Sequence, residues 1–377
     1  MHAHARGTLQ FLWREIVKNT ARKAIVAAIA VASGVALLAG CAQAPSDSGD
    51  GATSAKKDFL PCMISDSGGF DDHSFNELGF NGLVSASKSL GVDYKKAESK
   101  TDADYQPNIT SMVSQNCNLI ITVGFNLADA TKAAAAQNPD TKFAIIDDNS
   151  IKADNVQPII FDTAQAAFLG GYAAASYSKT GTVGTFGGMQ IPTVTIFMDG
   201  FADGVAYYNK QKNKDVKVVG WNVQSQKGSF TGGFDANDSA QQVAQGIIDQ
   251  NADVIMPVGG PIYQSAATAI KNSGKSIAMI GVDADVYNTD PSVRSILLTS
   301  VQKGIDPSVQ AVVKAAADGK FSNTPYVGTL KNDGVGLAPF HDFESKVDPG
   351  LQGEIDKIKQ GIIDGSITVT SPASPKS

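Results

Sequence analysis

The sequence predicts an α/β protein of two lobes, each a doubly wound parallel sheet, hinged by chain segments that cross between them. From residue 58 onward, short apolar runs rich in β-branched residues alternate with amphipathic stretches, which is the rhythm of β-α-β units. The runs are apolar on both sides, as in strands of a sheet that is covered on both faces. The alternation passes through two cycles, and the 377 residues exceed the roughly 100 to 200 residues of one domain.

The composition is that of a soluble α/β protein and sets one class of partner aside. Hydrophobic residues make up 42% of the chain and charged residues 18%, and the formal net charge is −6. Binding of DNA or RNA needs a basic face that neutralises phosphates. The acidic balance therefore predicts no nucleic-acid partner.

The first forty residues have the pattern of a secretory signal peptide. A basic region precedes a run of small and apolar residues at 24–36, and the run ends in "LLAGC", residues 37–41; the basic residues are Arg14, Lys18, Arg22 and Lys23. A transmembrane anchor is the alternative, but the run is at the short limit of the about 20 residues that span a bilayer. Because "LAGC" resembles a bacterial lipobox, we expect residues 1–40 to be removed and Cys41 to carry a lipid.

Residues 41–57 have almost no large apolar side chain and cannot contribute to a core. We expect them to form a flexible tether between the lipid on Cys41 and the folded part of the chain. A domain anchored in this way lies on the extracytoplasmic side of the cell membrane and acts on solutes there.

The two cycles define the elements of the two lobes. In the first cycle we expect helices at 74–90 and 127–137 and strands at 59–65, 92–98, 119–124, 143–147 and 158–161. In the second cycle we expect helices at 193–210, 239–250 and 263–273 and strands at 181–187, 216–222, 254–258 and 278–282. A last strand and helix at 295–319 resemble the units of the first lobe. We therefore expect a first lobe of residues 58–162 and 284–325 and a second of residues 163–283 and 326–371.

Two cysteines remain in the folded part, each at the beginning of a strand-like run. Cys62 and Cys117 introduce the first and third expected strands, which are neighbours in a doubly wound sheet. Neighbouring strands lie about 5 Å apart, within reach of a disulfide. Two buried free thiols are the alternative.

Polar and glycine residues gather immediately after the expected strands. Ligands of doubly wound sheets bind at the carboxyl ends of the strands, so this placement indicates a binding site. The candidates are residues 66–72, Gly124 and Phe125, Asp147 and Asp148, 187–190, Gly259 and Gly260, 283–285 and 300–303. Turn chemistry alone would explain any one of these loops.

The residue inventory argues against most enzymes and predicts neither a cofactor nor a metal. The part of the chain after the signal segment has two histidines, His73 and His341, without a nucleophile nearby in sequence, and no Walker loop, "HExxH", "GxSxG" or "GxGxxG" motif. Nucleoside hydrolases hold Ca²⁺ with "DxDxxxDD", and "SDSGGFDD" at 65–72 is superficially similar. Serines stand where the first two aspartates of that motif should be, so half of the oxygen ligands are missing.

The same stretch fits a binding role. "DDHSFN" at 71–76 starts a helix, where a carboxylate caps exposed amides and favours the positive end of the dipole. Phe80 lies about one turn beyond Asn76, so we expect an aromatic face and a polar helix terminus to address one ligand.

On these residues the chain resembles the basic membrane protein family of substrate-binding lipoproteins, which includes purine nucleoside receptors of ABC importers. The resemblance rests on "SDSGGFDDHSFNELGFNGL", "LIITVGF", "FAIIDD", "FDTAQAAFLGGYAAA", "GTFGGMQIPTVTIFMDGFADG" and "IGVDADVY" in this order. It implies a type I periplasmic-binding-protein fold that closes over a nucleoside.

The resemblance also implies roles for single residues. Asp71 and Phe80 resemble residues that contact the base, with Phe80 stacking on it, and Asp147 resembles the carboxylate that reads the purine edge. Asp283 and Lys303 resemble the pair that holds the ribose hydroxyls. Gly259 and Gly260 resemble the small residues that let the backbone approach the sugar.

Two positions depart from the family's pattern. His73 stands where many relatives have lysine. Met256 stands where an aromatic residue would be expected on the second side of the base, and methionine packs on a ring less selectively. The identity of the base is therefore open.

The sequence as a whole predicts a lipid-anchored receptor, a monomer, that captures a nucleoside by closure of two lobes and presents it to an ABC permease. A receptor of the same fold for a sugar or a furanosyl signal molecule is one alternative. From other classes, a Ca²⁺-dependent nucleoside hydrolase and a surface adhesin stay open.

Overall fold

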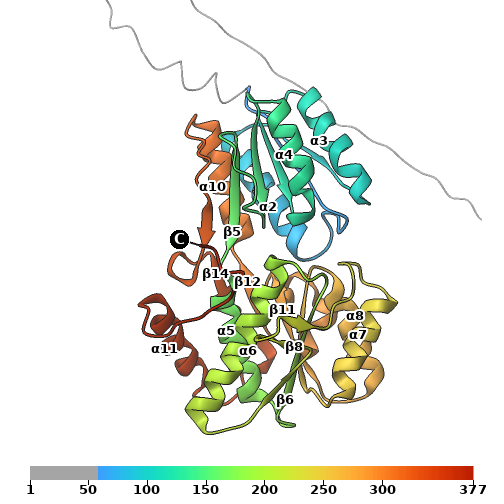
Figure 1. The fold of residues 1–377 in the computed structure, drawn as a ribbon, viewed down its shortest axis with the longest axis vertical. Helices are drawn as coiled ribbons and strands as arrows, with labels where there is room; N and C mark the ends of the chain where they lie inside the picture. Colours follow the sequence, from blue (N-terminus) through green and yellow to red (C-terminus); the bar gives the residue numbers. More distant parts are fainter. Residues whose placement is uncertain (1–57, 377) are drawn as a thin grey trace, which may run out of the picture. The chain divides into compact units, whose positions relative to one another are not determined.

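The computed structural model describes residues 58–376, drawn as a ribbon in Figure 1. The expected signal peptide, the lipid on Cys41 and the tether at 41–57 lie outside the described residues. Among residues 58–376, no helix is both long and apolar enough to cross a bilayer.

The first sheet consists of six parallel strands in the order β13-β5-β4-β3-β1-β2. The strands are β1 (Pro61–Ile64), β2 (Lys95–Ala97), β3 (Leu119–Val123), β4 (Lys142–Ile146), β5 (Val156–Phe161) and β13 (Tyr326–Gly328). Side chains alternate between the two faces of a strand. Met63 and Ile121 accordingly belong to one buried cluster and Cys62 and Ile120 to another, so both faces of this sheet must be covered.

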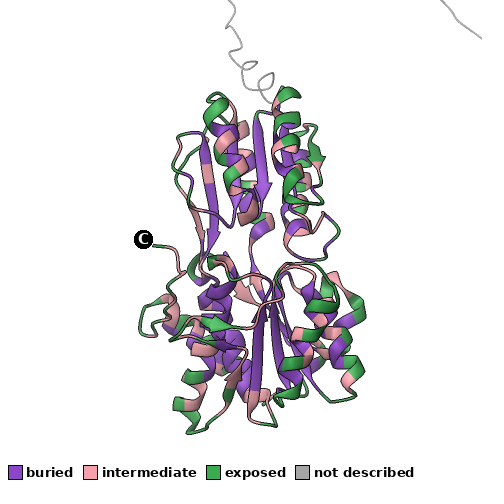
Figure 2. Ribbon diagram, turned by 45° about the vertical axis from the view of Figure 1, so that its right-hand side comes forward, coloured by how far each residue is buried: buried purple, intermediate pink, exposed green. Residues whose placement is uncertain are grey.

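Helices cover both faces of the first sheet. Leu83 of α2 (Phe75–Leu90) and Val309 of α10 (Ile305–Ala317) share a cluster with Met63, and these two helices lie side by side. The helices α3 (Tyr105–Ser114) and α4 (Ala128–Gln137) share the other cluster with Cys62. Figure 2 shows buried strands between helices whose outward faces are exposed.

The second sheet repeats this plan in the order β14-β12-β11-β10-β6-β7. Its strands are β6 (Thr182–Gly187), β7 (Lys217–Val219), β10 (Val254–Val258), β11 (Ala278–Asp283), β12 (Leu297–Lys303) and β14 (Val335–Leu337), of which β14 is antiparallel to β12. The helices packed on it include α5 (Thr163–Tyr177), α6 (Pro192–Lys212), α7 (Asp238–Asp249) and α8 (Ile262–Ser273), and α11 (Leu351–Ile363) packs on α5.

The helices α5 and α6 approach unusually closely because glycines face the partner backbone. A Cβ atom at Gly171 would lie 2.0 Å from the carbonyl oxygen of Phe201, and one at Gly204 would lie 2.0 Å from that of Phe168. Any side chain there would force the helices apart. The glycine-rich motifs "FLGGYAAA" and "MDGFADG" are therefore explained by helix packing.

Three segments cross between the two sheets, and they touch one another through glycines. They join β5 to α5 at Asp162, β12 to α10 at Gly304, and β13 to β14 near Gly334. The amide of Asp162 donates to the carbonyl of Gly328 (2.8 Å), and the amide of Gly304 donates to that of Gly334 (2.8 Å). A Cβ atom at Gly334 would lie 2.3 Å from Cα of Gly328.

The expected division into lobes is wrong at two strands. Residues 284–325 were expected in the first lobe and 326–371 in the second, but β12 pairs with β11 in the second sheet and β13 pairs with β5 in the first. The connection from β11 to β12 is short, and a short connection places a strand beside its predecessor. The apolar pattern identifies a buried strand but carries no information about which sheet it enters.

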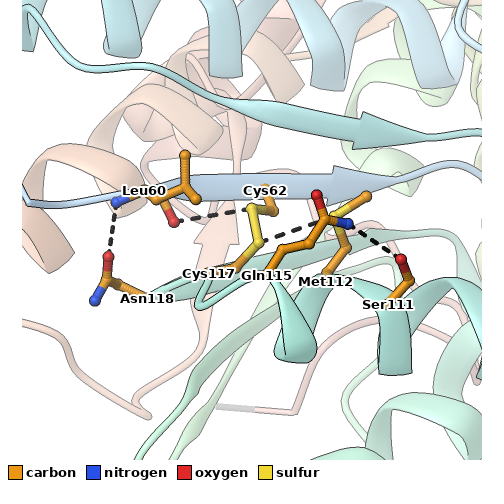
Figure 3. Close-up of a disulfide and its surroundings, with 7 residues drawn as sticks. All are labelled: Leu60, Cys62, Ser111, Met112, Gln115, Cys117 and Asn118. Atoms are coloured by element: carbon orange, nitrogen blue, oxygen red, sulfur yellow. Dashed lines mark hydrogen bonds between the residues drawn. A yellow bond between two sulfur atoms is a disulfide. The ribbon is translucent and has the colours of Figure 1, made fainter.

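A disulfide joins Cys62 on β1 to Cys117 immediately before β3, with Cα atoms 6.0 Å apart (Figure 3). Two hydrogen bonds beside it align the strands. The amide of Leu60 donates to Oδ1 of Asn118 (2.7 Å), and the amide of Asn118 donates to the carbonyl of Leu60 (2.9 Å). The bridge thus closes a loop that contains α2, β2 and α3.

Candidate functional site

A cavity lies where the carboxyl ends of strands from both sheets meet. It contains about 570 Å³ of space not filled by protein atoms, part of it open to solvent. Its lining includes residues at the ends of β1, β3, β4, β10, β11 and β12 or just beyond them, namely Asp66, Gly124, Asp147, Gly259, Asp283 and Lys303. Loops after strands therefore supply most of its polar atoms.

The charged end of the cavity is one ammonium between two carboxylates. Lys303 Nζ lies 2.5 Å from Oδ2 of Asp147, which follows β4 of the first sheet, and 3.2 Å from Oδ1 of Asp283, which ends β11 of the second. All three side chains are buried. Although Oδ1 of Asp283 is at ion-pair distance, it has no hydrogen bond of acceptable geometry within residues 58–376, so a buried acceptor there remains free for a ligand.

The backbone at both carboxylates is in the left-handed region. The φ angle is 65° at Asp147 and 67° at Asp283, a conformation that is uncommon for residues other than glycine. Such strain is found at ligand sites, where surrounding structure holds a side chain in a required direction. Both aspartates are directed into the cavity in this way.

The ammonium stays charged in its buried position. Burial lowers the pKa of Lys303, but the attraction of Asp147 and Asp283 more than offsets it, and the pKa lies above its usual value. Rings surround the same ammonium, with centroids at 5.0 Å for Phe75, 5.1 Å for Phe197 and 5.9 Å for Phe161. Two carboxylates thus share one ammonium at this end of the cavity, and burial raises the pKa of the Asp147 carboxyl.

A second polar cluster connects β1 to the start of α2. Asp72 accepts hydrogen bonds from the amides of Ser74, Asn76 and Glu77 at 2.9–3.0 Å and so satisfies the first turn of the helix. The side-chain amide of Asn76 donates to Oδ1 of Asp66 (2.8 Å) and to Oδ2 of Asp72 (3.0 Å). The terminus of α2 and the end of β1 therefore form one rigid unit.

Burial raises the pKa of Asp66 to about 6, and the neighbouring charge of Asp72 adds to this rise. Its Oδ1 atom is occupied by Asn76 and by the amide of Gly68 (3.0 Å). Its Oδ2 atom accepts no hydrogen bond within residues 58–376. Asp66 therefore offers the cavity an acceptor near neutral pH and a donor in acid.

Aromatic side chains from both lobes line the space between these clusters. Phe75 opens α2 in the first lobe, and Phe234 lies in the loop before α7 in the second. The ring of Phe234 packs directly on the backbone of two glycines. A Cβ atom added at Gly188 would lie 2.4 Å from the ring, and one added at Gly259 would lie 2.6 Å from it. Gly259 also has a φ of 138°, which a residue with a side chain rarely adopts.

Seven of the ten predicted ligand-binding residues line the cavity; they are Gly124, Phe125, Asp147, Gly259, Gly260, Asp283 and Lys303. Asp71, Phe80 and Met256 do not. Asp71 is exposed, and its neighbour Asp72 takes the capping position. Met256 is fully buried within β10 among core residues, because a strand reaches the cavity only beyond its last residues, here Val258 and Gly259.

Phe80 faces away from the cavity because of helical phase. Phe75 and Phe80 are five residues apart on α2, which separates them by roughly 140° around the helix. Phe80 packs instead against Phe70 and Tyr94, with ring centroids at 4.9 and 5.7 Å. Phe75 is therefore the aromatic residue that α2 directs to the cavity.

Sequence reasoning left other lining residues without a role or missed them. Asp66 and Asp72 lie within the candidate stretch 66–72, but no ligand contact was predicted for either of them. Phe197 lies in the first turns of α6, on the side that packs toward the sheet. Phe234 lies in a glycine-rich loop without any signal of its own. Among the described residues, no group of three or more His, Cys, Asp or Glu side chains is arranged to hold a metal ion.

Comparison with known proteins identifies the family of this chain. Residues 59–370 match the Bmp family model, described as "ABC transporter substrate-binding protein PnrA-like". The chain is 31% identical over 363 residues to the ABC transporter nucleoside-binding protein BmpA of Lactococcus lactis subsp. cremoris (strain MG1363), covering 92% of this chain and 98% of that protein. It is 29% identical to basic membrane protein A of Borreliella burgdorferi, covering 81% and 86%.

The solved structure of an ABC transporter system solute-binding protein from Aeropyrum pernix K1 superposes on this chain with a TM-score of 0.74. The two are 25% identical, and the match covers 83% of this chain and 94% of that one. The predicted fold class, a two-lobed type I periplasmic-binding-protein fold, is confirmed.

Proposed function

The chain belongs to the Bmp family of PnrA-like ABC transporter substrate-binding proteins, and from that premise we propose that it captures a nucleoside and presents it to an ABC permease. The family consists of substrate-binding proteins and not of enzymes. The observation that carries the proposal is a cavity with buried, paired charge at one end and aromatic rings from both lobes beside it.

The charged end is suited to a ribose. Adjacent hydroxyls can donate to the carboxylates of Asp147 and Asp283, while the ammonium of Lys303 donates to the same hydroxyl oxygens. This assignment moves Asp147 from the base edge to the ribose, because Asp147 and Asp283 contact one ammonium and must address the same end of a ligand.

The base then lies between Phe75 and Phe234, in place of Phe80 and Met256. Stacking on an aromatic ring stabilises a bound base by about 1–3 kcal/mol and tolerates any base. The free Oδ2 atom of Asp66 accepts from a ring N–H or an amino group at the edge. A buried acceptor penalises ligands that leave it unpaired, so Asp66 is a determinant of base preference.

The charge of the cavity favours nucleosides over nucleotides. The carboxylates Asp66, Asp72, Asp147 and Asp283 outnumber the single ammonium of Lys303 among the lining side chains. A phosphate would be repelled by this excess and would lose its hydration on entry. We therefore expect nucleotides to bind much more weakly than nucleosides.

Binding and release require the lobes to separate about the three crossovers. In the described state two contacts join the lobes beside the cavity: Ser74 Oγ donates to the carbonyl of Val282 (3.3 Å), and Lys303 pairs with Asp147. We propose that the protein works as a monomer held on the extracytoplasmic face of the membrane by a lipid on Cys41, where it meets its permease.

A receptor for a sugar or a furanosyl signal molecule is the second candidate. The charged end alone would bind such a ligand, since ribose contacts do not need the rings. The two proposals differ at Phe75 and Phe234, which matter for a nucleoside and hardly for a sugar.

A thermal-shift screen of the chain from residue 42 onward tests the proposal, with nucleosides, nucleotides, free bases, ribose and other sugars, with and without Ca²⁺. A ligand at about 100 times its dissociation constant adds roughly 2.7 kcal/mol to the free energy of unfolding. We expect nucleosides to stabilise the protein without Ca²⁺ and to be recovered intact. Stabilisation by sugars but not nucleosides would favour the second candidate, and no stabilisation after removal of bound ligand would overturn both.

A further inference from the structure

A second cavity adjoins the first at its charged end. It contains about 1150 Å³ of space not filled by protein atoms, part of it open to solvent. Four residues line both cavities: Phe125, Asp147, Thr193 and Lys303. The charged pair of Asp147 and Lys303 therefore borders both spaces.

One wall of the second cavity is the segment of residues 371–376. Ala373, Ser374, Pro375 and Lys376 line the space together with residues of the loop after β4 and of the start of α6. The match to the family model ends at residue 370, so this wall lies beyond the part of the chain that the family model describes.

The segment of residues 371–376 is held in place by buried acceptors. Ser371 Oγ donates to Oδ2 of Asp199 (2.6 Å), a fully buried carboxylate on α6 that also accepts from Trp221 Nε1 (2.9 Å). Ser374 Oγ donates to Oδ1 of Asp162 (2.9 Å), the residue at the crossover between β5 and α5. These bonds fix the wall against the second lobe and the hinge.

The surface that the second cavity offers is mainly apolar. Its apolar residues are Phe125, Ile160, Phe161, Pro192, Ile196, Ala373 and Pro375, while Asp148, Asn149 and Ser150 are among the polar residues at its edge. The cations of Lys152 and Lys376 belong to exposed side chains, whereas the buried Lys303 is already neutralised by carboxylates. An apolar, uncharged group gains by entering such a space, and an anion does not.

We infer that residues 371–376 close a second compartment of the ligand site, which takes a small, uncharged, apolar group attached to the ribose of the bound nucleoside. The inference rests on the proposed function. If Asp147, Asp283 and Lys303 hold the two ring hydroxyls, the 5′ carbon is the ribose position that can carry a substituent without loss of those contacts. The expected ligand class is therefore a 5′-substituted nucleoside, for example a 5′-deoxy-5′-alkylthio derivative.

Calorimetric titration of the protein, purified in detergent as the cell makes it, tests the inference. The probes are adenosine, inosine and uridine, each paired with its 5′-deoxy-5′-methylthio derivative. Burial of one methyl-sized group corresponds to about a four-fold gain in affinity, so we expect the methylthio derivative of the nucleoside that binds to be at least about four-fold tighter than its parent.

Variants at Ala373, with a control at Pro372, link any such gain to the compartment. Ala373→Trp fills the space, and we expect the ratio of the two affinities to fall to about one. Ala373→Leu serves the same purpose with a smaller side chain if the tryptophan variant does not fold. Pro372→Ala, at an exposed neighbour that does not line the cavity, should keep the full ratio.

The outcomes separate the two proposals. If no parent nucleoside and no derivative binds, the proposed function fails, and the inference fails with it. If a parent nucleoside binds but its methylthio derivative is equal or weaker, or a 5′-phosphate is tighter than both, the compartment is not an apolar extension of the site. A gain that survives Ala373→Trp and Ala373→Leu would also overturn it.

Discussion

The ammonium of Lys303, at the end of β12 in the second sheet, lies 2.5 Å from a carboxylate oxygen of Asp147, which follows β4 in the first sheet. The same ammonium lies 3.2 Å from Asp283 in its own sheet. One cation thus serves carboxylates from both lobes. Separation of the lobes would part Lys303 from Asp147, so this contact favours the described state and assembles the charged end of the cavity at the same time.

Replacement of Lys303 by methionine should therefore reduce both stability and binding. Removal of one partner of a buried ion pair leaves uncompensated charge and costs about 3–5 kcal/mol. Urea unfolding at pH 7 measures the loss, and thermal shift with the best nucleoside measures binding. Lys331→Met, at an exposed lysine, is the control. Unchanged stability in Lys303→Met would contradict the role of the pair.

The two phenylalanines of α2 should behave differently. Phe75→Ala removes a ring from the cavity and should weaken nucleoside binding by about 1–3 kcal/mol, the value of one stacked base. Phe80→Ala removes a ring that packs on Phe70 and Tyr94, so stability should fall while nucleoside affinity stays within about two-fold. Calorimetric titration of both variants with the nucleoside measures the two affinities. If Phe80→Ala weakened binding and Phe75→Ala did not, Phe80 and not Phe75 would be the stacking residue.

The raised pKa of Asp66 makes stability depend on pH in a defined direction. In the folded protein the pKa is about 6, against an ordinary value of 3.8, so between these values the folded state binds the proton more tightly than the unfolded chain does. The free energy of unfolding should therefore fall as pH rises from 4 to 6, by an amount on the order of 3 kcal/mol from this group.

Denaturant unfolding of the wild type and Asp66→Asn from pH 4 to 8 isolates that contribution. The difference between the two proteins should change across the window from 4 to 6 and be constant above about 7. The control is Asp71→Asn, which alters an exposed neighbour and should follow the wild type. If the free energy of unfolding of Asp66→Asn ran parallel to that of the wild type from pH 4 to 6, the carboxyl of Asp66 would titrate in its ordinary range.

Loss of the disulfide should destabilise the first lobe. The sequence separation of the two cysteines is 55, and on the chain-entropy model a bridge that closes a loop of this length contributes roughly 4 kcal/mol. The double variant Cys62→Ala and Cys117→Ala should lower the midpoint of urea unfolding accordingly. Thiol titration of the unreduced chain from residue 42 should find neither cysteine reactive, and reactive thiols at both positions would refute the bridge.

Two glycines within helices should respond to alanine with opposite signs. Gly171 on α5 leaves no room, since a Cβ atom would lie 2.0 Å from a backbone oxygen of α6, whereas Gly246 on α7 has open space around it. Gly246→Ala should stabilise by about 0.5–1 kcal/mol through helix propensity alone. Gly171→Ala should destabilise by more than that, as judged by thermal unfolding of both variants.

Much of the fold was visible in the sequence because strands and helices bury residues at different periods. The apolar runs at 119–124 and 254–258 correspond to β3 and β10. The two lobes and the position of the cavity at the strand ends followed from parallel-sheet topology. By contrast, the sheet that β12 joins depends on pairing with β11, which the residues of β12 do not specify.

Within the site, residues that directly follow a strand were predictable. Asp147 and Asp283 had to lie at the carboxyl edges of their sheets, and both line the cavity. The choice between Phe75 and Phe80 was not predictable, because it depends on the rotation of α2 about its axis. Phe234 enters from a loop whose path is set by contact with Gly188 and Gly259.

The amino-acid sequence by itself determined the α/β class, the repeated lobe, the lipobox-like pattern around Cys41 and the set of strand ends that line the cavity, since each depends on composition or on local periodicity. The tertiary structure decided which side chains converge. Lys303 meets Asp147 across 156 positions of the chain, and residues 371–376 reach Asp162 and Asp199. Such contacts arise when separate elements are packed together, and no local pattern encodes them.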